Sequence, residues 1–249
     1  MTAAALSPFF RLLRFDRIDS TSDEAKRLAA AGAAEGTLVW ALEQGAGRGR
    51  RGRSWVSPRG NLYLSLVLRP AGTARAAAQL GFAAALAVAE ACAAVLPAGA
   101  DVRCKWPNDV LIGGAKAAGI LLESVAGAGQ GVAWMVLGIG VNLASHPAAT
   151  EFPATSLAAA GAEVTPEAML PILAGRLLAW YETWRRQGFA PVREAWLARA
   201  FALGGPIRVR LAAGELGGRF AGLDADGMLL LDGAEGPRAI AAAEVFPAG

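Results

Sequence analysis

The sequence predicts an α+β fold in which a mixed, mostly antiparallel sheet is backed by helices and followed by a small β-barrel. Three observations lead to this prediction: short strand-like runs with tight turns over residues 102–140, helical patterns over 165–203, and only short β-runs thereafter. Of the 249 residues 54% are hydrophobic, so the chain can bury a large core. We therefore expect a main domain over residues 1–203 and a small β domain over 204–249.

The first elements are a short N-terminal stretch and a helix. Met1–Phe15 is shorter than the two helices and turn of a helix-turn-helix, so no DNA-reading domain is expected before the core. Thr21, with Glu24 three residues later, is typical of a helix start, because the hydroxyl and the carboxylate cap each other's backbone N–H groups. The helix is expected to end near Gly32.

Two strands and a long loop follow. Residues 37–43 and 61–68 have the composition of strands, and residues 44–57 between them form a loop rich in glycine and arginine. A loop of this length inside a compact domain is usually functional. Residues 74–100 are apolar, but alanine is weakly hydrophobic and polar residues interrupt the stretch. It therefore predicts a buried helix and no membrane span.

The centre of the chain predicts β-hairpins. Gly113–Gly114 and the glycine-rich run 127–131 provide tight turns between short strands. The expected strands cover residues 102–105, 110–112, 117–125 and 132–140. Because tight turns join consecutive strands, this part of the sheet is expected to be antiparallel.

Helices and then short strands complete the chain. Thr165, Pro166 and Glu167 supply a cap, a proline at the first helical position and an acid in the first turn, and the apolar pattern continues to about Trp184. A second helix is expected over residues 191–203. Short β-runs separated by glycine and aspartate turns then cover residues 207–211, 218–223, 228–231 and 238–245.

Charge, cysteine and histidine content exclude several classes of protein. The net charge of +3 is too small to indicate a nucleic-acid or membrane partner by itself. Cys92 and Cys104 are too few for a disulfide framework and no signal peptide opens the chain, so we expect a cytoplasmic protein. With His146 as the single histidine, a multi-histidine metal site is excluded and a histidine-based triad is disfavoured.

The most informative segment is Gly47–Arg53, in which three glycines alternate with four arginines. It contains G-x-G-x-x-G, but a strand rather than a helix follows, which excludes the dinucleotide-binding fingerprint. A glycine-rich chain carrying guanidinium groups favours binding of a carboxylate or phosphate over a merely solvated basic loop. RNA is an anion of the same kind, so it stays open as a ligand.

Lysine is rare in this sequence, since Lys26, Lys105 and Lys116 are the only lysines among 24 basic residues. Lys26 lies on a predicted helix face and requires no function. Lys105 and Lys116 each border an apolar strand, where an ammonium group suits a phosphate or a developing oxyanion, or simply reaches solvent. None of the three lysines follows a glycine, as the lysine of a P-loop does. ATP binding by a P-loop is therefore excluded.

Two further features lie beside these motifs. Gly138–Asn142 ends an apolar strand with two glycines and an amide, a pattern that permits close approach to a ligand and also fits a plain turn. Trp55 and Trp106 adjoin the charged motifs and are expected to wall a pocket.

The order of these motifs resembles that of biotin protein ligases, enzymes that adenylate biotin and attach it to a carrier protein. The motifs are Asp19-Ser20-Thr21, Gln44 with Gly47–Arg53 and Trp55, Lys105–Asp109, Lys116–Glu123, and Gly138–Asn142. The resemblance spans residues 12–200, and the arginine run together with Lys-Trp-Pro-Asn-Asp is highly specific. It implies a class II aminoacyl-tRNA synthetase-like catalytic domain with a C-terminal SH3-like β-barrel, in the short class without an N-terminal DNA-binding domain.

The resemblance also implies a role for each matched residue. Catalysis would depend on Lys116, Arg48 and Arg50. Biotin would be bound by Ser20, Thr21, Gln44, Arg48, Arg50, Lys116, Gly119 and Leu121. ATP would be bound by Arg50, Arg51, Arg53, Trp55, Lys105, Asn108, Asp109 and Asn142, with Asp109 also at the Mg²⁺. Two positions depart from the family, since Ser22 stands where asparagine is usual and Ala243 stands where glycine is usual.

The implied reaction converts biotin and ATP, with Mg²⁺, into biotinyl-5'-AMP and then transfers biotin to a lysine of a biotin carboxyl carrier protein. The carrier would belong to acetyl-CoA, propionyl-CoA or pyruvate carboxylase. An exposed sheet edge is compatible with a homodimer. Two alternatives stay open: a lipoate or octanoate protein ligase or transferase, which shares the fold and a catalytic lysine, and an RNA-binding module that uses the arginine loop.

Overall fold

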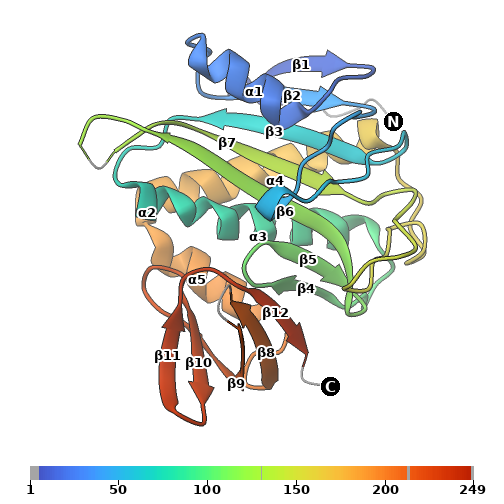
Figure 1. Ribbon diagram of the computed structural model, residues 1–249. Helices are drawn as coiled ribbons and strands as arrows, with labels where there is room; N and C mark the ends of the chain where they lie inside the picture. The colour runs from blue at the N-terminus through green and yellow to red at the C-terminus, as the bar shows by residue number, and fades with distance from the viewer. Residues whose placement is uncertain (1–5, 130, 212–213, 248–249) are drawn as a thin grey trace.

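The computed structural model describes residues 6–129, 131–211 and 214–247, which form two sheets and several helices (Figure 1). The larger sheet has seven strands in the order β1-β2-β3-β7-β6-β5-β4. These strands are β1 (Arg11–Phe15), β2 (Thr37–Ala41), β3 (Leu62–Leu68), β4 (Val102–Lys105), β5 (Asp109–Ile112), β6 (Ala115–Ala126) and β7 (Val132–Val141). Only β1 and β2 pair in parallel, so the expected mixed and mostly antiparallel sheet is confirmed.

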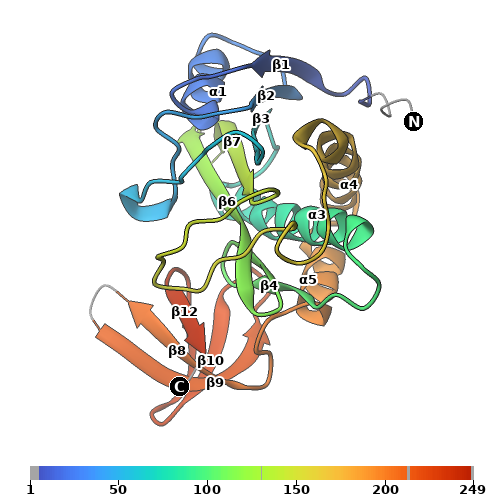
Figure 2. The same cartoon turned by 90° about the vertical axis from the view of Figure 1, so that its right-hand side faces the viewer.

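Helices cover both faces of this sheet. They are α1 (Thr21–Ala30), α2 (Ala74–Ala78), α3 (Leu80–Val95), α4 (Pro166–Gln187) and α5 (Phe189–Ala198). Helix α1 lies on one face, while α3 and α4 lie on the other (Figure 2). Because side chains alternate along a strand, Val39 and Val136 pack against α1, whereas Leu38 and Leu137 join the larger core around α3.

The alanine-rich stretch is a core helix. Among the described residues, Ala74–Val95 is long and apolar enough to cross a membrane, but 72% of its most apolar window is buried inside the fold. Residues on every side of α3 are buried. An apolar helix of this kind belongs in the centre of a protein, as expected from its sequence.

A second sheet follows the helices. Its strands are β8 (Pro206–Leu211), β9 (Gly214–Leu223), β10 (Leu229–Gly233), β11 (Gly236–Ile240) and β12 (Glu244–Pro247), all antiparallel in the order β11-β10-β9-β8-β12. Trp106 connects this sheet to the larger one, because its buried indole N–H donates to the carbonyl of Gly227 at 3.1 Å. Of the two tryptophans expected to wall a pocket, Trp55 lines the cavity described below and Trp106 does not.

The start of α1 differs by one residue from the prediction. Ser20, not Thr21, is the cap: its backbone is extended and its side chain accepts a hydrogen bond from the N–H of Asp23 at 3.3 Å. The hydroxyl of Thr21 instead donates to Gln44. Glu24 binds Arg27 rather than closing a capping box. The hydrogen bond from Thr21 to Gln44 therefore replaces the capping contact that the local sequence pattern predicted for Thr21.

Other boundaries also changed. Strand β1 was not predicted, because its side chains are mostly exposed and show no alternation. Helix α5 begins at Phe189 and ends at Ala198, earlier than expected. The run 238–245 is divided between β11 and β12. The Gly113–Gly114 turn is confirmed, with both residues at positive φ, while residue 130 of the 127–131 turn lies outside the described residues.

Candidate active site

Strand register places the charged motifs in one row across the larger sheet. Lys105 pairs with Asp109, Asp109 with Gly119, Gly119 with Gly140, and Gly140 with Tyr63. Residues that pair across neighbouring strands point to the same face. A lysine and an aspartate thus stand at one end of a row whose middle consists of glycines, which leaves open space above the sheet.

A cavity of about 440 Å³ occupies this space. The arginine loop covers it, the sheet forms its floor, and residues 147–154 and the end of the C-terminal sheet close its side. Arg48 and Lys116 both line it, although they come from different elements. A guanidinium of the loop and the ammonium of Lys116 thus face one space.

The glycines of the floor make room for Trp55. A Cβ on Gly140 would lie 2.6 Å from the indole of Trp55, and one on Gly119 would lie 3.0 Å from it. The ammonium of Lys116 lies 5.4 Å from the centre of the same ring, within the range of a cation–π contact. Trp55 Nε1 is buried and has no hydrogen-bond partner among the described residues. This nitrogen faces the glycine floor, since it would lie 2.6 Å from a Cβ on Gly140.

Hydroxyl and amide groups form a buried network at the α1 end of the cavity. The backbone N–H and the hydroxyl of Thr21 donate to Gln44 Oε1 at 2.8 and 3.0 Å. Ser65 Oγ donates to Thr21 Oγ1 at 2.9 Å and lies 3.1 Å from Ser22 Oγ. Gln44 Nε2 donates to Ser57 at 2.9 Å. Each polar group is thus held in a fixed orientation before any ligand binds.

The opposite end holds a charge cluster that we call the Asp109 triad, formed by Asp109, Lys105 and Lys116. Asp109 Oδ1 lies 2.6 Å from Lys116 Nζ and Oδ2 lies 3.2 Å from Lys105 Nζ. The side chains of Asp109, Lys105 and Lys116 are 11%, 7% and 27% exposed, so Lys116 is the more exposed of the two ammonium groups. Two cations share one carboxylate, which leaves one positive charge in excess.

Burial and charge act in opposite directions within the triad. Burial alone would raise the pKa of Asp109, but the charges and hydrogen bonds of Lys116 and Lys105 outweigh it and leave that pKa below its ordinary value. For Lys105, burial dominates and lowers the pKa in spite of the attraction of Asp109. Asp109 is thus held ionised between its two partners.

The triad does not suit a protein-bound Mg²⁺. Both oxygens of Asp109 already face ammonium groups, which would repel a divalent cation. Within residues 6–129, 131–211 and 214–247, no group of three or more His, Cys, Asp or Glu side chains could hold a metal. The geometry therefore does not support the expectation that Asp109 is a metal ligand.

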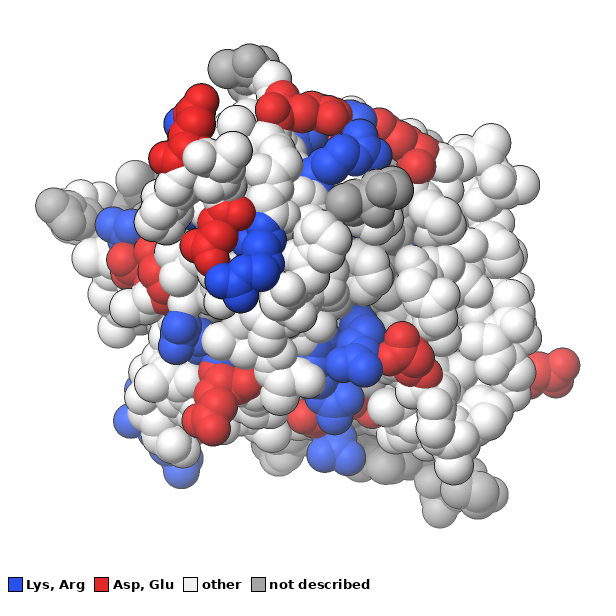
Figure 3. Space-filling view, turned by 90° about the horizontal axis from the view of Figure 1, so that it is seen from below, with Lys and Arg blue, Asp and Glu red and all other residues white. Residues whose placement is uncertain are grey.

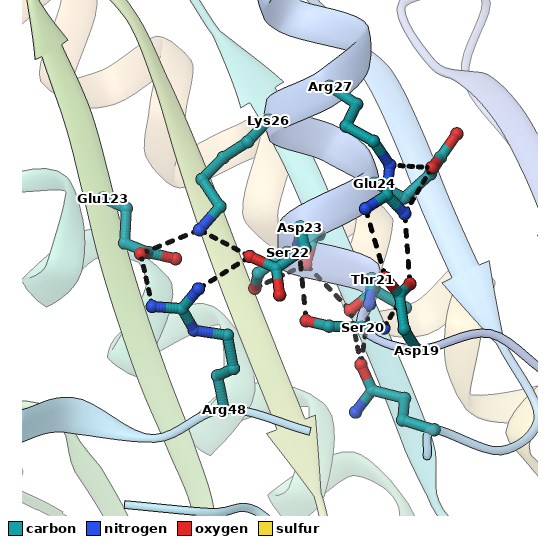
Figure 4. Close-up of polar contacts among 12 residues, drawn as sticks. Asp19, Ser20, Thr21, Ser22, Asp23, Glu24, Lys26, Arg27, Arg48 and Glu123 are labelled. Carbon is teal, nitrogen blue, oxygen red and sulfur yellow. Dashed lines mark hydrogen bonds and ion pairs between the residues drawn. The ribbon is translucent and has the colours of Figure 1, made fainter. Parts of the chain in front are cut away.

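The loop arginines are each engaged by the protein. Arg48 binds Asp23 and Glu123, beside α1 (Figure 4). Arg50 donates to Asn108 Oδ1 at 3.1 Å, and burial together with the charge of Arg51 lowers the pKa of Arg50. Arg53 and Arg51 pair with Glu244 of the C-terminal sheet. The loop is therefore attached to α1, to the larger sheet and to the C-terminal sheet.

The cavity collects most of the residues that the sequence singled out. It is lined by Thr21, Gln44, Arg48, Arg50, Arg53, Trp55, Lys105, Asn108, Asp109, Lys116, Gly119, Leu121 and Asn142. Ser20 and Arg51 do not line it: Ser20 caps α1, and Arg51, at φ 54°, pairs with Glu244. Asn142 uses its amide N–H to hold the carbonyl of Thr155 at 3.0 Å.

Sequence reasoning missed several residues of the site. Ser65 carries no motif and was found only through the register of β3. Phe152 lies in a loop, with the ammonium of Lys105 4.3 Å from its ring centre, and packs against Phe246. Glu244 was noted only for the substitution beside it at Ala243. The signal for Ser65 is its composition, since this serine interrupts a strand that is otherwise leucine, valine and tyrosine.

The fold and the cavity match a known class of proteins. A family model described as the biotin/lipoate A/B protein ligase family matches residues 14–142, and one described as the biotin protein ligase C-terminal domain matches residues 202–246. The chain belongs to the biotin/lipoate A/B protein ligase family.

Individual relatives extend over most of the chain. It is 48% identical to the biotin–(acetyl-CoA-carboxylase) ligase of Paracoccus denitrificans, over 94% of this chain and 99% of the relative. It is 37% identical to the bifunctional ligase/repressor BirA of Bacillus subtilis, over 94% of this chain and 73% of the relative. The structure of the biotin protein ligase from Aquifex aeolicus in complex with biotin and ATP is similar, with a TM-score of 0.79, 27% identity and coverage of 94% and 97%.

Proposed function

We propose that this protein is an ATP-dependent biotin protein ligase. The observation that carries the proposal is the single cavity in which the arginine loop and Lys116 meet above a floor of glycines. The 48% identity to a biotin–(acetyl-CoA-carboxylase) ligase over almost the whole length of both chains supports the same activity.

The head group of biotin fits the hydroxyl and amide network. A ureido group carries N–H donors and a carbonyl acceptor, and Thr21 and Gln44 offer both kinds of partner in fixed positions. The backbone of Gly119 and Leu121 borders the same space. Ser22, where the family has asparagine, contributes its hydroxyl through Ser65 rather than a direct amide. The carboxylate of biotin would then extend toward Lys116 and the arginine loop.

The cationic end of the cavity suits the adenylation step. A carboxylate oxygen of biotin attacks the α-phosphorus of ATP, a new P–O bond forms, and the bond to pyrophosphate breaks. One cation about 4 Å from a unit negative charge contributes about 4 kcal/mol at an effective dielectric constant near 20. Lys116 and Arg50 would offset the charge that accumulates, Arg48 would hold the arginine loop over the reacting groups, and positioning supplies a further part of the rate.

The nucleotide would occupy the side of the cavity near the C-terminal sheet. Arg51 and Arg53 are held there by Glu244, and the aromatic rings of Phe152 and Phe246 offer flat surfaces beside the charged groups. Lys105, Asn108 and Asn142 complete the proposed contacts to phosphate and ribose. Mg²⁺ is not assigned to Asp109, and no step of the proposal depends on it.

The second step transfers biotin to the carrier. The ε-amino group of a carrier lysine attacks the acyl carbon of biotinyl-5'-AMP, an amide forms, AMP leaves, and the amine releases a proton. Lys116 would stabilise the oxyanion that develops on the acyl oxygen. A closed arginine loop would exclude water, which otherwise hydrolyses the mixed anhydride.

The arrangement of charge speaks against the RNA-binding alternative. The arginines of the loop are paired with acids or with an amide of the protein. On the face drawn in Figure 3, the visible basic side chains lie beside acidic ones rather than in a continuous stripe. Nucleic-acid binding requires cations that are free to displace counterions along a phosphate backbone.

Three further features belong to the proposal. The partner would be a biotin carboxyl carrier domain of acetyl-CoA, propionyl-CoA or pyruvate carboxylase, the first of which is named in the relative. The cytoplasm would be the site of action.

The catalytic part would end near residue 203, with the C-terminal sheet as a separate β domain. Strand β1 lies at the edge of the larger sheet, and this edge would permit a homodimer.

The decisive experiment measures exchange of labelled pyrophosphate into ATP with biotin, lipoic acid or octanoic acid as the acid substrate. We expect exchange to depend on biotin, and addition of a purified carrier domain to give a product heavier by one biotinyl group. Faster exchange with lipoic or octanoic acid would assign the protein to the lipoate branch. Absence of exchange with all three acids, together with salt-dependent binding of RNA, would favour the RNA-binding module.

A further inference from the structure

Four charged side chains form a closed cycle of ion pairs beside the cavity, which we call the Arg48 ring (Figure 4). Arg48 reaches Asp23 at 2.7 Å through Nη1 and Glu123 at 3.3 Å through Nη2. Lys26 reaches the same two carboxylates, at 2.6 and 3.1 Å. Each acid thus accepts two cations and each cation binds two acids, so the ring is neutral.

The ring joins three elements that are distant in the sequence. Asp23 and Lys26 lie on α1, Glu123 on β6 and Arg48 on the arginine loop. Glu123 pairs with Val136, a residue that packs against α1, so the register of β6 brings its carboxylate to the helix. Lys26, which the sequence alone gave no function, bridges the two acids.

Attachment of Arg48 constrains the whole loop. Arg48 pairs with Ser54 in a β-bridge, Gly49 N–H donates to Arg53, and Trp55 N–H donates to Gly47. Residues 47–55 therefore form a tight double-stranded turn held together by its own backbone hydrogen bonds. Arg48 is thus one of three side-chain attachments of the loop, beside Arg50 to Asn108 and Arg51 and Arg53 to Glu244.

We infer that Asp23 and Glu123 are positioning residues that act through Arg48 to hold the arginine loop over the cavity before substrate binds. The effect on catalysis rests on the proposed function. A loop that is already ordered loses less conformational entropy when biotin binds, and it retains the adenylate better once formed. Asp23 and Glu123 themselves touch no reacting atom.

The electrostatics of Asp23 agree with this role. Burial would raise the pKa of Asp23, but the hydrogen bonds and charges of Lys26 and Arg48 outweigh it and keep that pKa below its ordinary value. The four side chains are between 24% and 44% exposed, so the ring is accessible to solvent and able to open.

Helix α1 provides a matched control. On its other side Arg27 binds Asp19 at 3.1 Å and Glu24 at 2.7 Å, again one cation with two acids (Figure 4). Glu24, like Asp23, is an acid in the first turn of the helix. Glu24→Gln therefore removes a comparable ion pair and a comparable charge at the start of the helix. Glu24 pairs with Arg27 and not with the arginine loop.

The test compares Asp23→Asn, Glu123→Gln and the double variant with Glu24→Gln, in the full chain. Trypsin cleaves after arginine, so its rate at Arg48–Arg53 in the ligand-free protein reports how often the loop opens. For the double variant we expect cleavage there about three- to tenfold faster than in wild type, in line with the loss of the two exposed ion pairs that Arg48 makes. In biotin-dependent pyrophosphate exchange, KM for biotin should rise by a similar factor while kcat changes little.

The conservative variant and the controls decide the outcome. Asp23→Glu keeps the charge and should restore both cleavage rate and KM toward wild type, and Glu24→Gln should match wild type in both. The inference fails if the double variant is cleaved at the wild-type rate, or if Glu24→Gln has the same effect. A wild-type protein without biotin-dependent exchange would refute the proposed function alone, because trypsin cleavage measures the loop independently of the reaction.

Discussion

Two clusters of paired charges flank the same cavity, and they differ in burial and in balance. The Asp109 triad is built on strands, is largely buried, and has two cations for one acid. The Arg48 ring joins a helix, a strand and a loop, is partly exposed, and has equal numbers of cations and acids. The buried cluster keeps an excess positive charge at the Lys116 end of the cavity, whereas the exposed cluster attaches the arginine loop to α1 and β6.

Energetics explain this division. Removing one partner from a buried ion pair strands a charge away from water and costs about 3–5 kcal/mol, whereas exposed pairs contribute about 0–1 kcal/mol each. A buried cluster therefore cannot open and close during a catalytic cycle, but an exposed one can. The comparison predicts large effects from changes in the triad and small, loop-specific effects from changes in the ring.

The largest effect is expected for Lys116→Ala. The variant lacks the more exposed of the two triad ammonium groups, so biotin-dependent pyrophosphate exchange should fall by about 100-fold or more, the range found when one donor to a developing negative charge is lost. Circular dichroism and urea unfolding should show a folded protein. Arg185→Ala, on the exposed side of α4, serves as a control. Wild-type exchange in Lys116→Ala would remove Lys116 from the mechanism.

Asp109→Asn tests the buried cluster itself. The change leaves two ammonium groups without a carboxylate, and the free energy of unfolding in urea should fall by about 3 kcal/mol. Asp23→Asn, the matching change in the exposed ring, should cost about 1 kcal/mol or less. Equal losses in the two variants would contradict the distinction drawn between the clusters.

The same pair of variants predicts a pH dependence. The pKa of Asp109 in the folded protein is below its ordinary value of 3.8, so its contribution to stability is complete above that pH and is lost as pH falls through the lower, folded-state value. Stability of wild type should therefore decline in this acid range, and Asp109→Asn should decline less steeply. Unfolding by urea at a series of pH values between 7 and the acid limit of solubility measures the slope.

Much of the site, but not its assembly, was predictable from the sequence. The arginine loop, the lysine motifs and the strands beside them follow from local patterns. The resemblance to biotin protein ligases assigned these motifs to one site. Ser65, the Glu123–Arg48 contact and the row from Lys105 to Tyr63 depend on strand register, which brings together residues far apart in the chain. Thr21 shows the same limit, because its contact with Gln44 overrode the local capping pattern.

An intermediate effect is expected for Arg50→Gly. Arg50 lines the cavity and is held by Asn108, so its loss should loosen the loop and let biotinyl-5'-AMP escape. Free adenylate acylates any accessible amine, and added serum albumin should be biotinylated in the presence of the variant. Arg185→Ala, on the exposed side of α4 and away from the cavity, is the control. Equal labelling by both variants would show that Arg50 has no special part in retention.

The smallest effect is expected from salt, through its influence on tryptic cleavage of the arginine loop. Salt also distinguishes the exposed ring from the buried triad without a mutation. The Debye length falls from about 10 Å at 0.1 M ionic strength to about 3 Å at 1 M, and it screens exposed pairs far more than buried ones. Tryptic cleavage at Arg48–Arg53 should therefore rise by about two- to threefold over this range in wild type, in line with the strength of exposed pairs. It should rise less in the Asp23→Asn, Glu123→Gln double variant, which has no ring to screen. A cleavage site elsewhere in the chain corrects for the effect of salt on trypsin. If wild type and the double variant respond to salt alike, ion pairing in the ring does not control the loop.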